Sequence, residues 1–363
     1  MRTRIYLSIQ LHVLRSHLCA IGVFYFAANY VIIVSIIEKY AVVGKAGSGM
    51  EKIAEAKEAL NDVIFGSEEV VDLLFIALLA QGHVLLESVP GTGKTKLAKS
   101  FAKVVDGDFG RVQFTPDVLP SDVTGIRFFN PKRQEFELRP GPAVTNVLLA
   151  DEINRATPKT QSSLLEIMEE QQATIDGETV PAPAPFIVLA TQNPVETNHG
   201  TFPLPEAQLD RFLFQIDLGY PSRAEEKQLL QTYRKDDPSE QMKPMLTLEE
   251  IRTFQDRLKF ITVSDPVADY LLDLIRHTRE HTDVELGISP RGALALMRSA
   301  QARAFIDNRS YVSPNDIKTL APYVFIHRLT LTMEASIKKT AGQVAEEILQ
   351  VVSVPVEKGA ASK

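Results

Sequence analysis

From Glu51 onward, the chain alternates between segments with helical spacing of apolar residues and short, continuous apolar runs. Ile53, Ala56 and Leu60 recur three or four positions apart, which is the spacing of one helix face. The continuous runs that follow are typical of strands buried on both faces of a parallel sheet. The predicted strands are HVLLE (83–87), NVLLADE (146–152), FIVLATQN (186–193) and FLFQIDLGYP (212–221). The pattern therefore predicts an α/β core over residues 50–220.

After Pro221 the periodicity becomes helical throughout. Four segments there have apolar residues at helical spacing, and each has Ser, Asp or Pro near its start, as helix N-termini prefer. These segments are SRAEEKQLLQTYRK, DPVADYLLDLIRHTREH, SPRGALALMRSAQARAFID and SPNDIKTLAPYVFIHRL. The sequence predicts a second, small all-α domain over residues 221–350, followed by a disordered tail over 351–363.

The first 49 residues differ from the rest. Residues 18–37 carry no formal charge, and this run is long enough to span a bilayer as a helix. A start codon assigned too far upstream explains the segment equally well, because the ordinary pattern begins directly after Met50. The protein is expected to be cytoplasmic, with an anchor on the cytoplasmic side of a membrane only if residues 1–49 are expressed and 18–37 form a transmembrane helix.

Charge and cysteine content narrow the function classes. The formal net charge is −7, so no overall basic field favours a nucleic-acid backbone, and no nucleic-acid partner is expected. Cys19 is the one cysteine of the chain, which excludes a disulfide framework and any multi-cysteine metal site. A reducing compartment is the natural interpretation.

The stretch SVPGTGKT (88–95) lies between the first predicted strand and a predicted helix, the context in which backbone N–H groups cradle phosphates. Lys94 would reach the β- and γ-phosphates, and Thr95 would ligate Mg²⁺. Glycine is usual at the first position, where this chain has Ser88. A small residue with negative φ fits there, so we expect a modest change in affinity. The predicted nucleotide-binding residues are Ser88, Val89, Pro90, Gly91, Thr92, Gly93, Lys94 and Thr95.

Two acids and one amide at strand ends are further candidates for a role in binding and hydrolysing the nucleotide. Asp151 and Glu152 end an apolar strand, where the first would enter the Mg²⁺ shell and the second would face the attacking water. Asn193 ends another strand, where its amide could orient water or sense the γ-phosphate. It could equally be a turn-forming residue before Pro194.

Read together, DEINRATPKTQSSLLEIMEEQQ, ATQNPVE and GTFPLPEAQLDRF resemble the MoxR family of AAA+ ATPases, and the likeness extends from about Met50 to the C-terminus. The resemblance implies a P-loop ATPase core with a helical lid, assembled into a ring, commonly a hexamer, with ATP and Mg²⁺ bound between subunits. SVPGTGKT matches the Walker A motif except at Ser88, LLADE matches Walker B with Glu152 as the water-activating residue, and Asn193 matches sensor 1. Arg211 in LDRF matches the arginine finger, and Arg291 in ISPRGAL matches sensor 2.

Other interpretations of the two arginines remain open. Arg211 could form a surface pair with Asp210, and Arg291 could be a capping or surface residue after Pro290. Residues 129–143 resemble the family's insert in the second core helix, and Asp176-Gly177 signals a hairpin turn before sensor 1. Both inserts could face the pore or a client, or be plain surface hairpins.

The family resemblance implies chaperone-like remodelling that matures partner complexes, often by metal cofactor insertion, with clients that frequently carry von Willebrand factor A-type domains. Two alternatives share the core plan. One is a DNA-acting or magnesium-chelatase-type ring motor, and the other is a nucleotide-binding scaffold that hydrolyses weakly, with Ser88 as its sign.

Overall fold

The computed structural model describes residues 46–66, 68–89, 91–193, 201–234 and 237–355. The unit that begins at Gly49 contains nearly all of these residues and is described by itself. The apolar segment 18–37, Pro90 and residues 356–363 of the expected tail lie outside the described residues. In the ranges above, no helix is both long enough and apolar enough to cross a bilayer.

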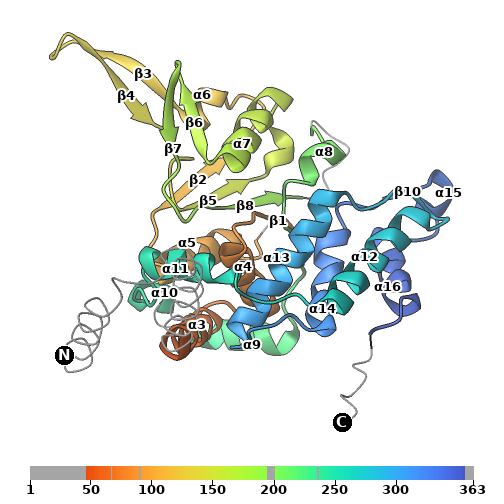
Figure 1. The fold of residues 1–363 in the computed structure, drawn as a ribbon. Coiled ribbons are helices and arrows are strands. Elements are labelled where there is room, and N and C mark those ends of the chain that lie inside the picture. Colours follow the sequence, from red (N-terminus) through yellow and green to blue (C-terminus); the bar gives the residue numbers. More distant parts are fainter. Residues whose placement is uncertain (1–45, 67, 90, 194–200, 235–236, 356–363) are drawn as a thin grey trace, which may run out of the picture. The chain divides into compact units, whose positions relative to one another are not determined.

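A five-stranded parallel sheet with the order β2-β5-β8-β1-β9 organises the first part of this unit, which confirms the predicted α/β class (Figure 1). The four predicted strands are present near their expected positions. The edge strand β2 was not predicted, because it alternates buried and exposed residues instead of forming an apolar run. The strands are β1 (Val84–Ser88), β2 (Phe109–Gln113), β5 (Val147–Asp151), β8 (Ile187–Gln192) and β9 (Phe214–Leu218).

Helices cover both faces of the sheet, and alternate strand residues therefore enter two hydrophobic clusters. Val84 and Leu86 of β1 pack in a cluster with the helices of one face, whereas Leu85 packs in a second cluster with α7 on the other. The larger cluster also contains Leu296 from the C-terminal part of the chain, so the two predicted domains share apolar contacts. The helices of this part are α3 (Ala46–Asn61), α4 (Glu68–Leu79), α5 (Lys94–Val104), α6 (Pro120–Thr124), η1 (Ile153–Arg155), α7 (Pro158–Glu170) and α8 (Glu206–Leu209).

Two antiparallel hairpins project from the core side by side (Figure 1). The predicted turn at Asp176-Gly177 is confirmed: it joins β6 (Gln172–Ile175) to β7 (Glu178–Pro181), and both turn residues have positive φ. The other hairpin pairs β3 (Gly125–Asn130) with β4 (Glu135–Pro140), so the insert expected at residue 129 begins earlier.

Helices dominate the chain after β9, as predicted, but the expected all-α character misses a short antiparallel pair, β10 (Val284–Leu286) with β11 (Thr330–Leu331). Hydroxyl residues cap several of these helices, as their sequences indicate. Ser222, for example, caps α9 in a capping box with Glu225. The helices are α9 (Arg223–Thr232), α10 (Pro238–Gln241), α11 (Leu248–Leu258), α12 (Asp265–Glu280), α13 (Pro290–Ile306), α14 (Pro314–Phe325), α15 (Met333–Ser336) and α16 (Ala341–Val351).

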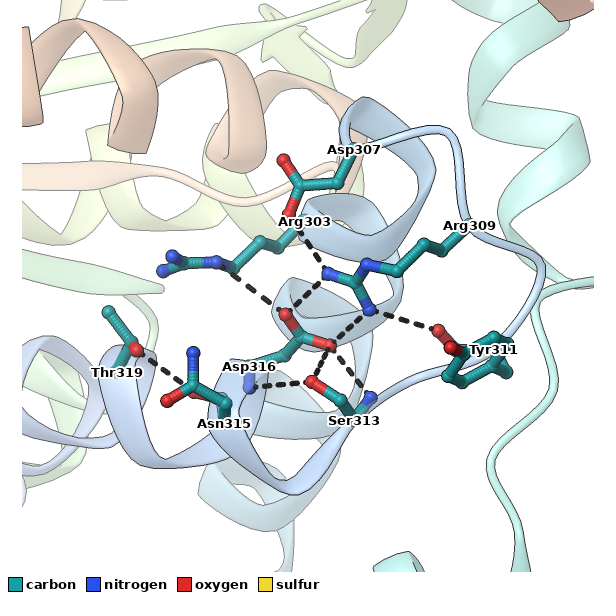
Figure 2. A network of polar contacts seen from close by, with 8 residues as sticks. All are labelled: Arg303, Asp307, Arg309, Tyr311, Ser313, Asn315, Asp316 and Thr319. Atoms are coloured by element: carbon teal, nitrogen blue, oxygen red, sulfur yellow. Dashed lines mark hydrogen bonds and ion pairs between the residues drawn. The ribbon is translucent and has the colours of Figure 1, made fainter.

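A buried carboxylate joins the loop after α13 to the start of α14 (Figure 2). Asp316 is 1% exposed, and each of its oxygens accepts a 2.7 Å hydrogen bond from Arg309. Its second oxygen also accepts from the backbone N–H and hydroxyl of Ser313. The partners of this network all belong to the C-terminal helices and their loops, so it stabilises that part of the chain internally.

Candidate functional site

Two glycines give the loop after β1 a backbone conformation that other residues rarely adopt. Gly91 and Gly93 have φ of 87° and 82°, in the left-handed region that favours glycine, and a Cβ at either position would meet no atom within 4 Å. Gly93 is the N-cap of α5, and among the described residues no side chain caps that helix. The first N–H groups of α5 therefore remain available to an anion, as the phosphate-loop hypothesis requires.

Ser88 ends β1 opposite Leu218 and is 2% exposed. It is not among the non-glycine residues with positive φ, so serine in place of the usual glycine introduces no backbone strain. Its hydroxyl has no hydrogen-bond partner in the described part of the chain. Farther along the loop, the Thr92 hydroxyl donates to the Val89 carbonyl at 3.2 Å.

At the end of β5, the two predicted acids, Asp151 and Glu152, both form a hydrogen bond with the hydroxyl of Thr191. The Thr191 hydroxyl donates to Asp151 Oδ1 at 2.8 Å and accepts from the Glu152 backbone N–H at 2.9 Å. Glu152 has φ of 58°, which turns the chain sharply after the strand. Thr191, which is fully buried, thereby fixes both acids relative to β8.

Residues of β2 contact the same acids. Arg111 Nη2 donates to Asp151 Oδ2 at 2.8 Å, and Gln113 Nε2 donates to Glu152 Oε2 at 2.8 Å. Arg155 also approaches Glu152 Oε2, at 3.3 Å. Sequence reasoning missed these partners, because the parallel register that sets Gln113 opposite Asp151 is not readable along the chain.

The predicted binding residues lie together at the carboxyl edge of the sheet, the edge at which its parallel strands end. The loop after β1, Asp151 at the end of β5 and the buried Asn193 just after β8 all lie there, because the three strands are parallel and adjacent in the order β5-β8-β1. β1 and β5 are therefore two strand spacings, roughly 10 Å, apart. The hydroxyl of Thr95 and the carboxylate of Asp151 are oxygen donors of the kind that suit Mg²⁺.

A cavity of about 530 Å³ lies along α5 beside this edge, lined by Thr95, Lys96, Lys99, Ser100, Lys103 and Asp237 among others. Lys96 pairs with Asp237 at 2.7 Å, and its ammonium lies 3.8 Å from the centre of the Tyr233 ring. The hydrogen bonds from Lys96 and Ser239 lower the pKa of Asp237 to about 2, so this carboxylate stays charged at neutral pH.

Arg211 lies at the opposite edge. β1 and β9 are parallel, with Val84 opposite Phe214 and Ser88 opposite Leu218, so the phosphate loop follows the carboxyl end while Arg211 precedes the amino end. Five-residue strands separate these edges by about 13 Å. His83, just before β1, confirms the location, since its backbone carbonyl accepts from the Leu213 N–H at 2.7 Å.

Arg291 joins Arg211 at this amino edge. Glu169, near the end of α7, binds both: Arg211 at 3.0 Å through one oxygen and Arg291 at 2.9 Å through the other. The adjacent Met168 carbonyl is 3.0 Å from His83 Nε2, which places this end of α7 beside the start of β1. The two arginines are thus brought together, away from the edge that carries the phosphate loop.

In the described residues, Arg211 pairs with Glu169 and not with Asp210. Asp210 instead binds two C-terminal residues, Arg328 at 2.6 Å and the Ser289 hydroxyl at 3.0 Å. Sequence reasoning found neither of these residues nor Glu169, because packing alone brings them together.

Comparison with known families and proteins agrees with this geometry. Residues 83–214 match the family described as "ATPase family associated with various cellular activities (AAA)", and residues 276–350 match the AAA lid domain. A parallel sheet with a phosphate loop, acids at the carboxyl edge and a helical lid define an AAA-type P-loop ATPase. The chain belongs to the MoxR family of AAA+ ATPases.

Relatives match over most of their length. The uncharacterized protein YeaC of Bacillus subtilis (strain 168) is 48% identical over 309 residues, covering 85% of this chain and 96% of YeaC. Chaperone MoxR1 of Mycobacterium tuberculosis is 41% identical over 303 residues, covering 81% and 80%. A crystal structure of a candidate ATPase from Cytophaga hutchinsonii is 37% identical with a TM-score of 0.82, covering 88% of this chain and all of that one.

Proposed function

We propose that this protein hydrolyses ATP with Mg²⁺ at sites shared between protomers of a homo-oligomeric ring, expected to be a hexamer. The observation that carries the proposal is the separation of the two charged groups in one chain. The phosphate loop lies at the carboxyl edge, whereas Arg211 lies at the amino edge, roughly 13 Å away along the strands. A neighbouring protomer is therefore the natural source of the arginine at each site.

At the carboxyl edge, the roles follow from position. The uncapped N-terminus of α5 and Lys94 bind the phosphates, while Thr95 and Asp151 hold the metal, which when bound neutralises charge on the phosphate oxygens. Glu152 orients the attacking water, and Asn193 lies between the loop and the acids. Arg111 neutralises Asp151 at 2.8 Å, so it must yield when Asp151 takes up a cation.

At the amino edge, Arg211 serves the neighbour's site, and Arg291 serves it too because both are bound to one Glu169 carboxylate. Glu169 neutralises the two cations until a phosphate of higher charge competes for them. An arginine from a neighbour stabilises the charge on the transferred phosphoryl group and makes turnover depend on assembly.

In this proposal, cycles of ATP binding and hydrolysis drive the remodelling or maturation of partner protein complexes. Support comes from the family and from relatives named Chaperone MoxR1 and MoxR, the latter in Paracoccus denitrificans at 30% identity. Clients with von Willebrand factor A-type domains are the expected partners. ATP turnover that rises only with DNA would instead indicate a DNA-acting motor.

The test of the chemistry is the Glu152→Gln variant. Glutamine keeps a hydrogen bond with Gln113 but cannot accept a proton, so ATP binding should persist while turnover falls by about 10²–10⁴-fold. Fluorescent nucleotide binding and phosphate release measure the two properties on the same preparation. Undiminished hydrolysis would remove Glu152 from its role. Negligible turnover of the unmodified chain would favour a nucleotide-binding scaffold.

A further inference from the structure

Arg328 follows α14 and its side chain is 3% exposed. A guanidinium has five N–H donors, and here five acceptors lie within hydrogen-bond distance. Four belong to the segment that carries Arg211: Asp210 Oδ1 at 2.6 Å, Asp210 O at 3.1 Å, Phe212 O at 2.5 Å and Leu213 O at 3.2 Å. The fifth, Val324 O at 2.6 Å, fixes the guanidinium to its own helix.

These bonds flank Arg211 on both sides. His327 adds another, because its Nε2 lies 3.0 Å from the Phe212 carbonyl. Burial, together with the charge of Arg328, lowers the pKa of His327 well below its usual value, so the ring is neutral. A carbonyl oxygen can only accept, so a hydrogen bond to it requires the hydrogen on Nε2. The main chain around Arg211 is therefore bound by two consecutive residues of the lid.

The same lid contacts reach Arg291. Asp210, whose first oxygen binds Arg328, accepts from the Ser289 hydroxyl with its second. Ser289 is the N-cap of α13, two residues before Arg291. A Cβ on Gly292 would come within 3.0 Å of Arg328 Cδ, so α13 passes directly over the guanidinium.

We propose that Arg328 is a positioning residue that fastens the Arg211 segment to the lid, so that the lid and this trans-acting arginine move together. The position of the lid then decides whether Arg211 reaches the neighbouring site. The inference rests on the proposed function, in which Arg211 serves a neighbour. Lysine cannot replace Arg328, because one ammonium cannot reach acceptors spread over three residues and Val324.

An ordinary structural ion pair is the competing explanation, and Arg309 offers a matched control. Arg309 binds the buried Asp316 through both terminal nitrogens, but its partners are all in the lid (Figure 2). Removing either arginine should destabilise the lid. Of these two arginines in the described part of the chain, only Arg328 contacts the main chain beside Arg211.

The first measurement compares Arg328→Lys with Arg309→Lys in the full chain. We expect Arg328→Lys to lower kcat by about tenfold to a hundredfold, the effect of a misplaced catalytic group, with little change in KM for ATP or in assembly. Arg309→Lys should lower the thermal midpoint and leave kcat intact. Equal loss of kcat in both variants would make Arg328 merely structural and overturn the proposal.

The second measurement mixes protomers. Arg328→Lys retains its own Lys94 and Glu152, and Glu152→Gln retains a correctly held Arg211. Mixed rings should therefore turn over more ATP than the sum of the separate preparations.

The reference mixture is Arg211→Ala with Glu152→Gln. Complementation by Arg211→Ala but not by Arg328→Lys overturns the positioning role and leaves the shared site standing. Failure of both mixtures overturns the shared site and the Arg328 proposal with it.

If Arg328→Lys does not assemble, Asp210→Asn tests the same link. This variant weakens the charged bond to Arg328 and alters the contact with Ser289, while the four carbonyl acceptors of Arg328 stay in place. A smaller fall in kcat at unchanged KM supports the proposal, and an assembled Asp210→Asn ring with unchanged kcat overturns it.

Discussion

The carboxyl and amino edges of the same parallel sheet hold their charged residues in place by different kinds of contact. At the carboxyl edge, the phosphate loop with Lys94 and the paired acids each come from a short, continuous motif, and contacts between neighbouring strands, such as that of Thr191 with Asp151, join these motifs. At the amino edge, Arg211 is held by Glu169 of α7, and its main chain by Arg328 of the lid. The first edge is built within the parallel sheet, and the second also depends on how the lid packs. Binding and turnover should therefore respond to different substitutions.

The largest effect is expected from Arg211→Ala. Loss of a trans-acting arginine should reduce turnover by about 10³–10⁵-fold while nucleotide binding, a property of the other edge, remains. Phosphate release and fluorescent-nucleotide titration measure the two separately. A parallel loss of binding would contradict the division between the edges.

Thr191→Val should have an intermediate effect. The hydroxyl bridges Asp151 and the Glu152 N–H, so its loss removes a hydrogen bond to a charged group, worth about 1.5–3 kcal/mol, and loosens both acids. We expect roughly tenfold slower turnover together with lower thermal stability.

The matched control for that variant is Thr160→Val, which removes another buried hydroxyl whose hydrogen bonds are with the Val118 carbonyl and the Thr157 hydroxyl and not with either acid. This control should lose stability alone. Equal kinetic loss in the two variants would indicate that Thr191 has no special place at the carboxyl edge.

Glu169→Gln should shift assembly-dependent turnover modestly. The pairs of Glu169 with the two arginines are partly exposed, and such pairs contribute about 0.2–1 kcal/mol each. Releasing the arginines should lower the protein concentration of half-maximal turnover by about two- to fivefold. Glu170→Gln, next to it on α7, is the comparison and should leave the concentration unchanged. A rise with Glu169→Gln would mean that the pairs orient the arginines productively.

The smallest effect is expected at Ser88. Its buried hydroxyl has no partner in the described ranges, so Ser88→Ala and Ser88→Gly should change KM for ATP by no more than about threefold, with glycine slightly less stable because it frees the unfolded chain. Steady-state kinetics and thermal melts suffice. A tenfold rise in KM for Ser88→Ala alone would show that the hydroxyl contacts the nucleotide.

Sequence reasoning was enough to predict four of the five strands of the parallel sheet and the position of the glycine loop and the acids at strand ends, because apolar runs and glycine loops are local signals. It missed β2, whose alternating pattern is weak, and with it the contacts of Arg111 and Gln113 to the acids. It also missed Glu169 and Arg328, since strand register and lid packing decide those contacts. The roles of all the predicted site residues, from the phosphate loop with Lys94 and Thr95 through Asp151, Glu152 and Asn193 to Arg211 and Arg291, remain predictions, as does the domain boundary near residue 221.

The measurement that tests the shared site most directly is ATP turnover per protomer across a dilution series of the full chain, followed together with its mass in solution. Turnover should rise steeply as rings form and stay near zero for monomers, because Arg211 and the phosphate loop of one chain lie at opposite edges of the sheet. Constant turnover per protomer down to fully monomeric protein would contradict the account.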